Sequence, residues 1–306
     1  MSETMNETVQ TSAAGASDAG EVVVSIRNLH KSYGDNVVLR GIDLDVHRGE
    51  VVVVLGPSGS GKSTLMHTLA GLDSATSGRI MFEGADITAM NDNQLTLLRR
   101  RRIGFVFQSF NLLPMFTAEQ NILMPLTLAG AKPDREWYGR LVSTLGLRER
   151  LTHRPNELSG GQQQRVAIAR ALIAKPSLVF ADEPTGNLDS VSSAEVLDFL
   201  RRSVKELGQT VIMVTHDAAA AAYADRAIVF ADGRIVADEA NPTAERMNEL
   251  LMAERERAVH VASGTGDPMA GRHRGVVPPV PPAPAPRIAS DGPAHAAASR
   301  RARHSR

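Results

Sequence analysis

Residues 56–63 have the types and the spacing of a loop that holds phosphate. They read Gly-Pro-Ser-Gly-Ser-Gly-Lys-Ser, which fits the pattern G-x-x-x-x-G-K-[ST] between an apolar run and a segment with helical spacing. Glycines let backbone N–H groups turn toward phosphate oxygens, and a helix N-terminus adds partial positive charge. We expect Lys62 to reach the β- and γ-phosphates of a nucleotide and the hydroxyl of Ser63 to ligate Mg²⁺. The residues predicted to contact the nucleotide here are Gly56, Pro57, Ser58, Gly59, Ser60, Gly61, Lys62, Ser63 and Thr64.

Two further strand-like runs end in residues that can act on a bound triphosphate. Asp182 and Glu183 follow an apolar run at 178–181, and His216 follows another at 210–215. A carboxylate at Asp182 can hold the hydration shell of Mg²⁺. Glu183 can polarise the water that attacks the γ-phosphate. The imidazole of His216 can donate a hydrogen bond to the γ-phosphate and so distinguish ATP from ADP.

A second anion site is predicted where Ser159, Gly160, Gly161 and Gln162 open a helix. Ser159 is a good helix N-cap, and the free N–H groups of the first turn attract negative charge. One phosphate chain needs only one cradle of this kind. A second cradle makes sense if two chains dock head to tail, so that each closes over the nucleotide of its partner.

The elements that must position these residues alternate between strand and helix. Runs at 22–26, 41–46, 51–55, 178–181, 210–214 and 226–230 read as strands, and stretches at 62–72, 162–174 and 193–207 have helical spacing. The run at 51–55 is Val-Val-Val-Val-Leu, which is typical of a strand buried on both faces. This order predicts an α/β fold with a mostly parallel sheet covered by helices.

The combined motifs resemble those of the ATP-binding-cassette (ABC) ATPases, the engine subunits of ABC transporters. The resemblance covers the Leu-Ser-Gly-Gly-Gln segment at 158–162, the phosphate loop, and the text LVFADEPTGNLD at 178–189. It implies a P-loop NTPase cassette with a RecA-like core, an antiparallel β part and an inserted helical subdomain. It also implies a C2 homodimer, or a pairing with a second cassette, around two ATP molecules with Mg²⁺.

The same resemblance assigns roles to single residues. Asp182 and Glu183 match the metal-organising aspartate and the catalytic glutamate, and His216 matches the switch histidine. Gln108, after the apolar run at 103–107, matches the glutamine that contacts Mg²⁺ or its water. Two further residues are implied to contact the nucleotide. These are Tyr33, by stacking on adenine, and Asp189, which ends the segment at 178–189.

Within the family, the text at 98–114 and the pair Gly186-Asn187 are similar to the lipoprotein-release and macrolide-export subgroup. Its ATPases work at the cytoplasmic face of the cell membrane on separate transmembrane permeases with few membrane helices. Gln120 departs from the subgroup, which has an acidic residue at that position near the expected permease contact. Two alternatives stay open: an importer ATPase of the amino-acid type, and a non-transport ABC ATPase.

Composition limits the remaining classes. The chain has 306 residues, a formal net charge of +0 and Cys 0, so disulfides and thiolate chemistry are excluded and no nucleic-acid partner is expected. Its apolar runs are far shorter than the ~20 residues of a membrane helix, and residues 1–20 do not read as a signal peptide. Composition predicts a disordered acidic tail at 1–20 and a disordered Pro/Ala/Arg-rich tail at 259–306. For the region between them, the resemblance implies an ABC ATPase domain at 21–258 with a helical subdomain at about 95–171.

Overall fold

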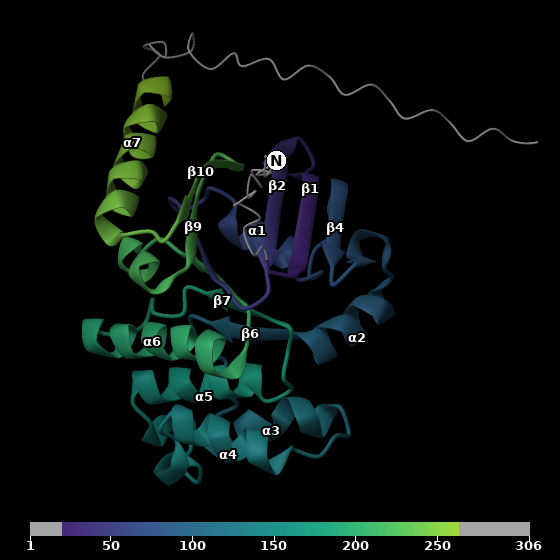
Figure 1. The fold of residues 1–306 in the computed structure, drawn as a ribbon, viewed down its shortest axis with the longest axis vertical. Helices are drawn as coiled ribbons and strands as arrows, with labels where there is room; N and C mark the ends of the chain where they lie inside the picture. Colours follow the sequence, from purple (N-terminus) through teal and green to yellow (C-terminus); the bar gives the residue numbers. More distant parts are fainter. Residues whose placement is uncertain (1–19, 263–306) are drawn as a thin grey trace, which may run out of the picture.

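A six-stranded sheet forms the centre of the molecule in this computed structural model, which describes residues 20–262 (Figure 1). Its strands lie in the order β10-β9-β3-β8-β7-β6, and all neighbours are parallel except β10 and β9. The strands are β3 (Val51–Leu55), β6 (Ile103–Phe107), β7 (Leu178–Asp182), β8 (Val211–Thr215), β9 (Arg226–Ala231) and β10 (Arg234–Ala240). The predicted parallel α/β core is therefore confirmed. Because the parallel strands share one direction, their carboxyl ends meet at one edge of the sheet.

A second sheet is antiparallel and has the order β2-β1-β4-β5. Its strands are β1 (Val22–Tyr33), β2 (Asn36–His47), β4 (Ser77–Phe82) and β5 (Ala85–Asp86). β1 and β2 are each twelve residues long, well beyond the predicted runs at 22–26 and 41–46. Register shifts interrupt their pairing, for example between Ile26 and Leu29, and such breaks hide the simple alternation that the sequence prediction used.

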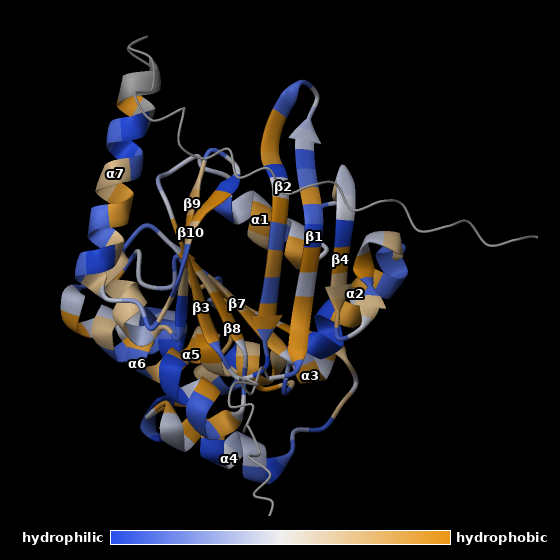
Figure 2. Ribbon diagram, turned by 45° about the horizontal axis from the view of Figure 1, so that its top comes forward, coloured by the Kyte–Doolittle hydropathy of each residue, from blue (hydrophilic) through white to orange (hydrophobic). Residues whose placement is uncertain are grey.

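The two faces of β3 contribute to two different hydrophobic clusters. Val52 and Val54 join the cluster that holds the antiparallel sheet and helix α1 (Lys62–Leu69). Val51, Val53 and Leu55 join the cluster on the other face, which is packed with helices. Figure 2 shows these apolar strands enclosed between the other elements. All five residues of β3 are buried, so the sequence prediction of a strand covered on both faces is confirmed.

Helices on the second face stack below the sheet in Figure 1. They include α3 (Ala118–Leu128), α4 (Arg135–Thr144), α5 (Gly160–Leu172) and α6 (Ser190–Leu207). Helix α2 (Asp92–Arg102) leads directly into β6. Strand β6 lies inside the range 95–171 that was predicted for the helical subdomain, and it belongs to the central sheet. Short 3-10 helices complete the order at η1 (Ile87–Ala89), η2 (Arg148–Arg150), η3 (Pro155–Glu157) and η4 (Ala218–Tyr223).

The described part of the chain ends in helix α7 (Ala244–Ala262), which the sequence reasoning had not identified. The helix packs against η4 and β9, and its Met247 is fully buried. The predicted boundary between residues 258 and 259 falls within this helix. The tails predicted at 1–20 and 259–306 lie almost entirely outside the described residues. Between residues 20 and 262, no helix is long and apolar enough to cross a membrane.

Candidate active site

The phosphate loop, residues 56–63, connects the carboxyl end of β3 to helix α1. A Cβ atom on Gly56 would lie 2.0 Å from the carbonyl oxygen of Phe230, so no side chain fits there. Gly59 and Gly61 have φ values of +81° and +102°, which L side chains rarely adopt. The buried hydroxyl of Ser60 has no hydrogen-bond partner in the structure. The loop thus has a backbone that its glycines leave bare next to the N-terminus of α1, which is the arrangement that binds phosphate.

Lys62 lies inside this loop and is 7% exposed. Its Nζ donates hydrogen bonds to the carbonyl oxygens of Gly56, at 2.8 Å, and Pro57, at 2.9 Å. Burial lowers the pKa of this amine, and the nearby carboxylates of Glu183 and Asp182 act in the opposite direction. The ammonium group is therefore held inside the loop with its charge only partly balanced.

Glu183 follows the end of β7 and has φ of +45°, an unusual backbone value for a residue with a long side chain. Its N–H donates to Val214 of β8, at 2.9 Å. The hydroxyl of Thr215 donates to Oε2, and Nδ1 of His216 lies 2.9 Å from Oε1. Two residues at the end of β8 therefore fix both oxygens of the Glu183 carboxylate. His216 itself is well exposed on its other side, with 63% of its side-chain surface accessible.

Asp182 is the last residue of β7, where it pairs in register with Phe107 of β6 and Val214 of β8. Burial raises the pKa of its carboxyl group, so the charged form is disfavoured until a cation comes near. Within residues 20–262 no cluster of three or more His, Asp or Glu side chains could hold a metal by itself. Mg²⁺ that arrives with a nucleotide is usually bound by one or two carboxylates together with phosphate oxygens and waters, and Asp182 is such a carboxylate. Ser63 and Gln108 offer further oxygen ligands.

Gln108 lies directly after β6, and its side chain contacts the segment after β7. Its Nε2 donates to Oδ1 of Asn187 at 3.3 Å, and Nδ2 of Asn187 donates to the Gln108 carbonyl oxygen at 3.0 Å. We call residues 184–189 the D loop. Asp189 ends this loop by capping α6, where it accepts hydrogen bonds from the N–H groups of Val191 and Ser192.

Tyr33 ends β1 on the antiparallel sheet. Its hydroxyl donates to Oδ2 of Asp73 at 2.5 Å, and Nζ of Lys31 lies 4.6 Å from the ring centroid. Lys31 also pairs with Oδ1 of Asp73 at 2.6 Å. The hydrogen bond to Asp73 raises the pKa of the Tyr33 hydroxyl. The ring is held at its edge and is 51% exposed, so it offers a platform for an aromatic base.

The segment Ser159, Gly160, Gly161 and Gln162 opens α5 as predicted. Ser159 and Gln162 form a capping box, in which each side chain accepts from the backbone N–H of the other. A Cβ on Gly160 would approach Leu188, and one on Gly161 would approach Ser192. Helix α5 belongs to the cluster on the opposite face of the sheet from α1. The segment thus contacts the D loop and α6 of its own chain.

Two further residues of α5 hold the loops of this site, and the sequence reasoning had missed both. Gln164 is fully buried, and its Nε2 donates to the carbonyl oxygen of Pro184 at 2.6 Å. Arg170 donates to the carbonyl oxygens of Phe110 at 2.7 Å and Asn111 at 2.5 Å. Phe110 and Asn111 have φ values of +56° and +51°. The signal in the sequence is a polar residue on the apolar face of a predicted helix, because most buried polar side chains hydrogen-bond to a neighbouring segment.

A cavity of about 550 Å³ lies beside Glu183. Glu183 and His216 line its one side, residues of α6 line another, and Asn248 of α7 also reaches it. The carboxylate of Glu183 is therefore accessible from solvent.

The fold and this arrangement define a P-loop ATPase. A family model described as "ABC transporter" matches residues 39–186. The chain belongs to the ABC transporter family, as an ATP-hydrolysing cassette.

Two kinds of curated relatives match the cassette. The lipoprotein-releasing system ATP-binding protein LolD of Geobacter metallireducens is 47% identical over 226 residues, which are 71% of this chain and 99% of that protein. The macrolide export ATP-binding/permease protein MacB of Syntrophobacter fumaroxidans is 46% identical over 254 residues, which are 80% of this chain and 35% of that protein. This chain therefore spans about a third of the MacB relative and nearly all of the LolD relative.

Solved structures agree with the fold. The dimeric structure of the ATP-binding cassette MJ0796 in a post-hydrolysis state with ADP and Pi has a TM-score of 0.63 and 39% identity. That match covers 72% of this chain and 99% of MJ0796. The structure of cbiO1 from Clostridium perfringens has a TM-score of 0.67 and 30% identity, and the match covers 79% and 95% of the two chains.

Proposed function

We propose that this chain dimerises around two ATP molecules and drives a separate membrane permease of the export or mechanotransmission type. One observation carries the chemical part of the proposal. The carboxylate of Glu183 is fixed by Thr215 and His216 beside a phosphate loop whose lysine is only partly neutralised. This arrangement suits attack of water on a terminal phosphate.

In the proposed mechanism the phosphate loop binds the triphosphate through its backbone N–H groups. Lys62 exchanges its hydrogen bonds to the Gly56 and Pro57 carbonyls for bonds to the β- and γ-phosphates, which balance its charge. Tyr33 stacks on the adenine ring. Ser63, Asp182 and Gln108 would hold Mg²⁺, which would supply positive charge to the bound triphosphate.

Glu183 orients the attacking water and accepts its proton. Thr215 and His216 hold the carboxylate in one orientation, so little conformational entropy remains to be lost in the transition state. With Nδ1–H donating to Glu183, His216 also donates to the γ-phosphate through Nε2 when both ring nitrogens carry a proton. These residues thus bind the substrate, position the water and take up the proton.

The proposed dimer follows from the position of the second anion site. Ser159 to Gln162 lie at the start of α5, on the opposite face of the sheet from α1 and its phosphate loop. In a head-to-tail C2 dimer this helix N-terminus covers the γ-phosphate held by the partner. The similarity to the dimeric MJ0796 structure supports this assembly.

The permease part of the proposal rests on the relatives. LolD and MacB are named for lipoprotein release and macrolide export, and this chain matches nearly the whole length of LolD. A chain that works in this way lies peripherally at the cytoplasmic face of the membrane. We therefore propose a permease with few membrane helices and a large outer domain as its partner.

The test is capture of the complex. Glu183→Gln, tagged and expressed in the native host, is trapped with MgATP, solubilised in mild detergent and purified, with Lys62→Ala as the matched control that lacks ATP closure. The expected result is a permease with few membrane helices that co-purifies with the first variant and not with the second. A many-helix permease with a substrate-binding protein would favour the importer. Ribosomes or DNA-repair factors would overturn the transport function.

A further inference from the structure

The segment after β6 and the D loop after β7 are joined by a reciprocal pair of hydrogen bonds. Nε2 of Gln108 donates to Oδ1 of Asn187, and Nδ2 of Asn187 donates to the backbone carbonyl oxygen of Gln108. The two residues are 79 positions apart in the chain. Because the Asn187 amide donates to a backbone oxygen that cannot turn away, its own orientation is fixed.

The neighbouring residue, Gly186, lets the Gln108 side chain come this close. A Cβ atom at position 186 would lie 2.6 Å from Nε2, 3.0 Å from Cδ and 3.2 Å from Cγ of Gln108. The φ of Gly186 is not in the left-handed region, so the backbone itself does not require glycine there. Glycine is therefore required at position 186 because any larger side chain would collide with the Gln108 amide.

Helix α5 also holds these two segments together, at the points where they leave β6 and β7. Nε2 of the buried Gln164 lies 2.6 Å from the Pro184 carbonyl oxygen and 3.5 Å from that of Phe107. Pro184 begins the D loop, and Phe107 directly precedes Gln108. The distance between the two segments is thus set in the core, and the Asn187 contact adds the orientation of one amide group.

That orientation has a chemical consequence. The side-chain amide of glutamine can turn over, because its terminal torsion has two broad and similar minima. Oδ1 of Asn187 can accept a hydrogen bond but cannot donate one, so the NH₂ group of the Gln108 amide, and not its oxygen, faces Asn187. Oε1, the atom through which a glutamine ligates a hard cation, is not used in this contact.

We propose that Asn187 is a positioning residue for Gln108: it holds the amide with Oε1 available to Mg²⁺ at the nucleotide, and Gly186 provides the space. This inference rests on the proposed function, because it deepens the role of Gln108 in that site. Partners of metal ligands that fix their orientation change metal affinity by about 10- to 100-fold when removed. Asn187 acts on the metal through Gln108, with which it forms the two hydrogen bonds described above.

The test measures binding instead of turnover. In the Glu183→Gln background, the affinity for a fluorescent ATP analogue is titrated with Mg²⁺ and again with EDTA. We expect Asn187→Ala to reduce the gain from Mg²⁺ about tenfold and to leave the affinity in EDTA unchanged. Gly186→Ala, which pushes the amide away, should have the same effect. The matched controls are Asn156→Ala, at an exposed asparagine in η3, and Gly139→Ala in α4, where a Cβ meets nothing within 4 Å.

A double-mutant cycle separates this role from a general effect on the D loop. With Gln108→Ala already present, neither Asn187→Ala nor Gly186→Ala should reduce the gain from Mg²⁺ any further. If Mg²⁺ raises the affinity of the parent for the ATP analogue and Asn187→Ala does not change that increase, this inference is overturned and the proposed function is not. A further loss in the Gln108→Ala background also overturns it. A parent that binds ATP with no gain from Mg²⁺ at all overturns the metal assignment in the proposed function as well.

Discussion

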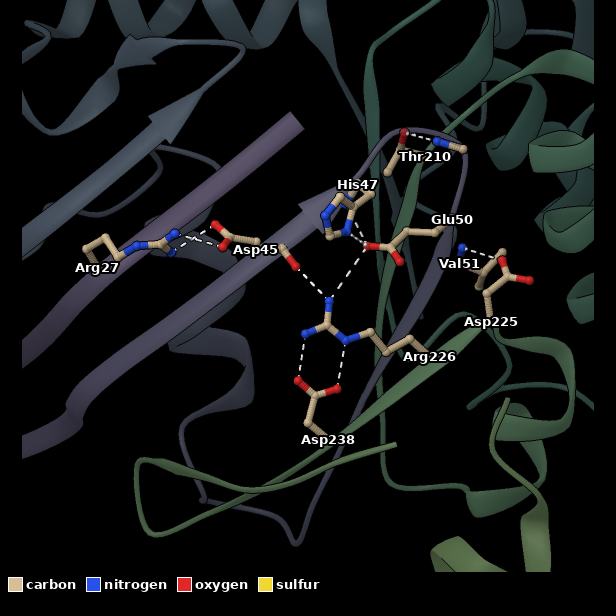
Figure 3. A network of polar contacts seen from close by, with 10 residues as sticks. Arg27, Asp45, His47, Glu50, Val51, Thr210, Asp225, Arg226 and Asp238 are labelled. Atoms are coloured by element: carbon tan, nitrogen blue, oxygen red, sulfur yellow. Dashed lines mark hydrogen bonds and ion pairs between the residues drawn. The ribbon is translucent and has the colours of Figure 1, made fainter. Parts of the chain in front are cut away.

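The amino and carboxyl ends of the parallel strands differ in how their charges are balanced. At the amino end, Arg226 of β9 makes two hydrogen bonds to Asp238, at 2.7 and 2.6 Å, and a third to the Asp45 carbonyl oxygen at 2.7 Å (Figure 3). Arg27 pairs with Asp45 in the same way. At the carboxyl end, Lys62 has only two backbone carbonyls as hydrogen-bond acceptors.

The directions of the pKa shifts express the same difference. At the amino end, the hydrogen bond from Arg27 lowers the pKa of Asp45, and the hydrogen bond to Asp238 raises the pKa of Arg226. At the carboxyl end, burial raises the pKa of Asp182 and lowers that of Lys62. Folding thus favours the charged forms at one end of the sheet and disfavours them at the other.

This contrast indicates what each end does. The paired amino end joins the antiparallel sheet to the central sheet, because Asp45 lies on β2 and Arg226 on β9. The carboxyl end holds charges that the protein alone does not balance. In the proposed function, a triphosphate with its metal ion would balance them. Substitutions at the carboxyl end should therefore change binding and turnover, whereas those at the amino end should change stability.

The largest expected effect is that of Glu183→Gln on turnover. Loss of a general base lowers rates by about 10²- to 10⁴-fold, and the amide keeps most of the shape of the carboxylate. We expect ATP hydrolysis, measured by phosphate release, to fall by that amount while ATP still binds and closed dimer accumulates on size exclusion. An unimpaired rate would show that Glu183 is not the base.

The next effect is that of Lys62→Ala on nucleotide affinity. Two charge-assisted hydrogen bonds of about 1.5 kcal/mol each correspond to roughly a hundredfold in Kd. Because burial already disfavours the charged amine, we expect the thermal midpoint to stay within about 2 °C of the wild type. Calorimetric titration with ATP and thermal unfolding measure the two quantities. Tight ATP binding by this variant would contradict the assignment of residues 56–63 as the phosphate loop.

At the amino end, Arg226→Leu should lower stability and leave chemistry intact. The substitution leaves Asp238 without its partner and the Asp45 carbonyl without a donor, at a cost of about 1–3 kcal/mol, or a fall of roughly 3–10 °C in Tm. ATP turnover per folded molecule at low temperature should match the wild type. Arg79→Leu, which removes a more exposed pair with Asp86, is the control with little expected change. An Arg226→Leu variant with normal Tm would break the contrast between the ends.

The smallest expected effects are on stability, and they have opposite signs for two aspartates, Asp45 and Asp182. The pKa of Asp45 is lowered, so its ionised form stabilises the fold above its ordinary value of 3.8, and this contribution is lost as pH falls through the lowered pKa. Asp45→Asn should therefore be less stable than the wild type at neutral pH, by under about 1 kcal/mol, with the difference vanishing in acid.

The pKa of Asp182 is raised, so its ionised form costs stability once pH exceeds the ordinary value. Asp182→Asn should therefore be as stable as the wild type at neutral pH, or more so. Thermal unfolding of both variants between neutral and acid pH checks these signs. Equal destabilisation by the two substitutions at neutral pH would contradict the contrast.

Contiguous motifs explain why much of the fold and site followed from the sequence. The β-branched run of β3, the glycines of the phosphate loop and the Ser159 cap each act through local backbone preferences. The extent of β1 and β2 and the existence of β10 and α7 were not predicted. Bulges interrupt the alternation of the first pair, and the many charged residues of α7 obscure its packed face, which includes the buried Met247.

By itself, the sequence determined the α/β class, the family resemblance and the residues placed at strand ends, because these depend on neighbours within a few positions of the chain. Only the tertiary structure decided which of those ends meet. The contacts of Gln108 with Asn187, of Gln164 with Pro184, and of His216 with Glu183 join residues 20 to 79 positions apart. They depend on strand order and on loop backbones with positive φ, such as those of Glu183 and Phe110. Local propensity does not favour such conformations, and packing from several elements is what holds them.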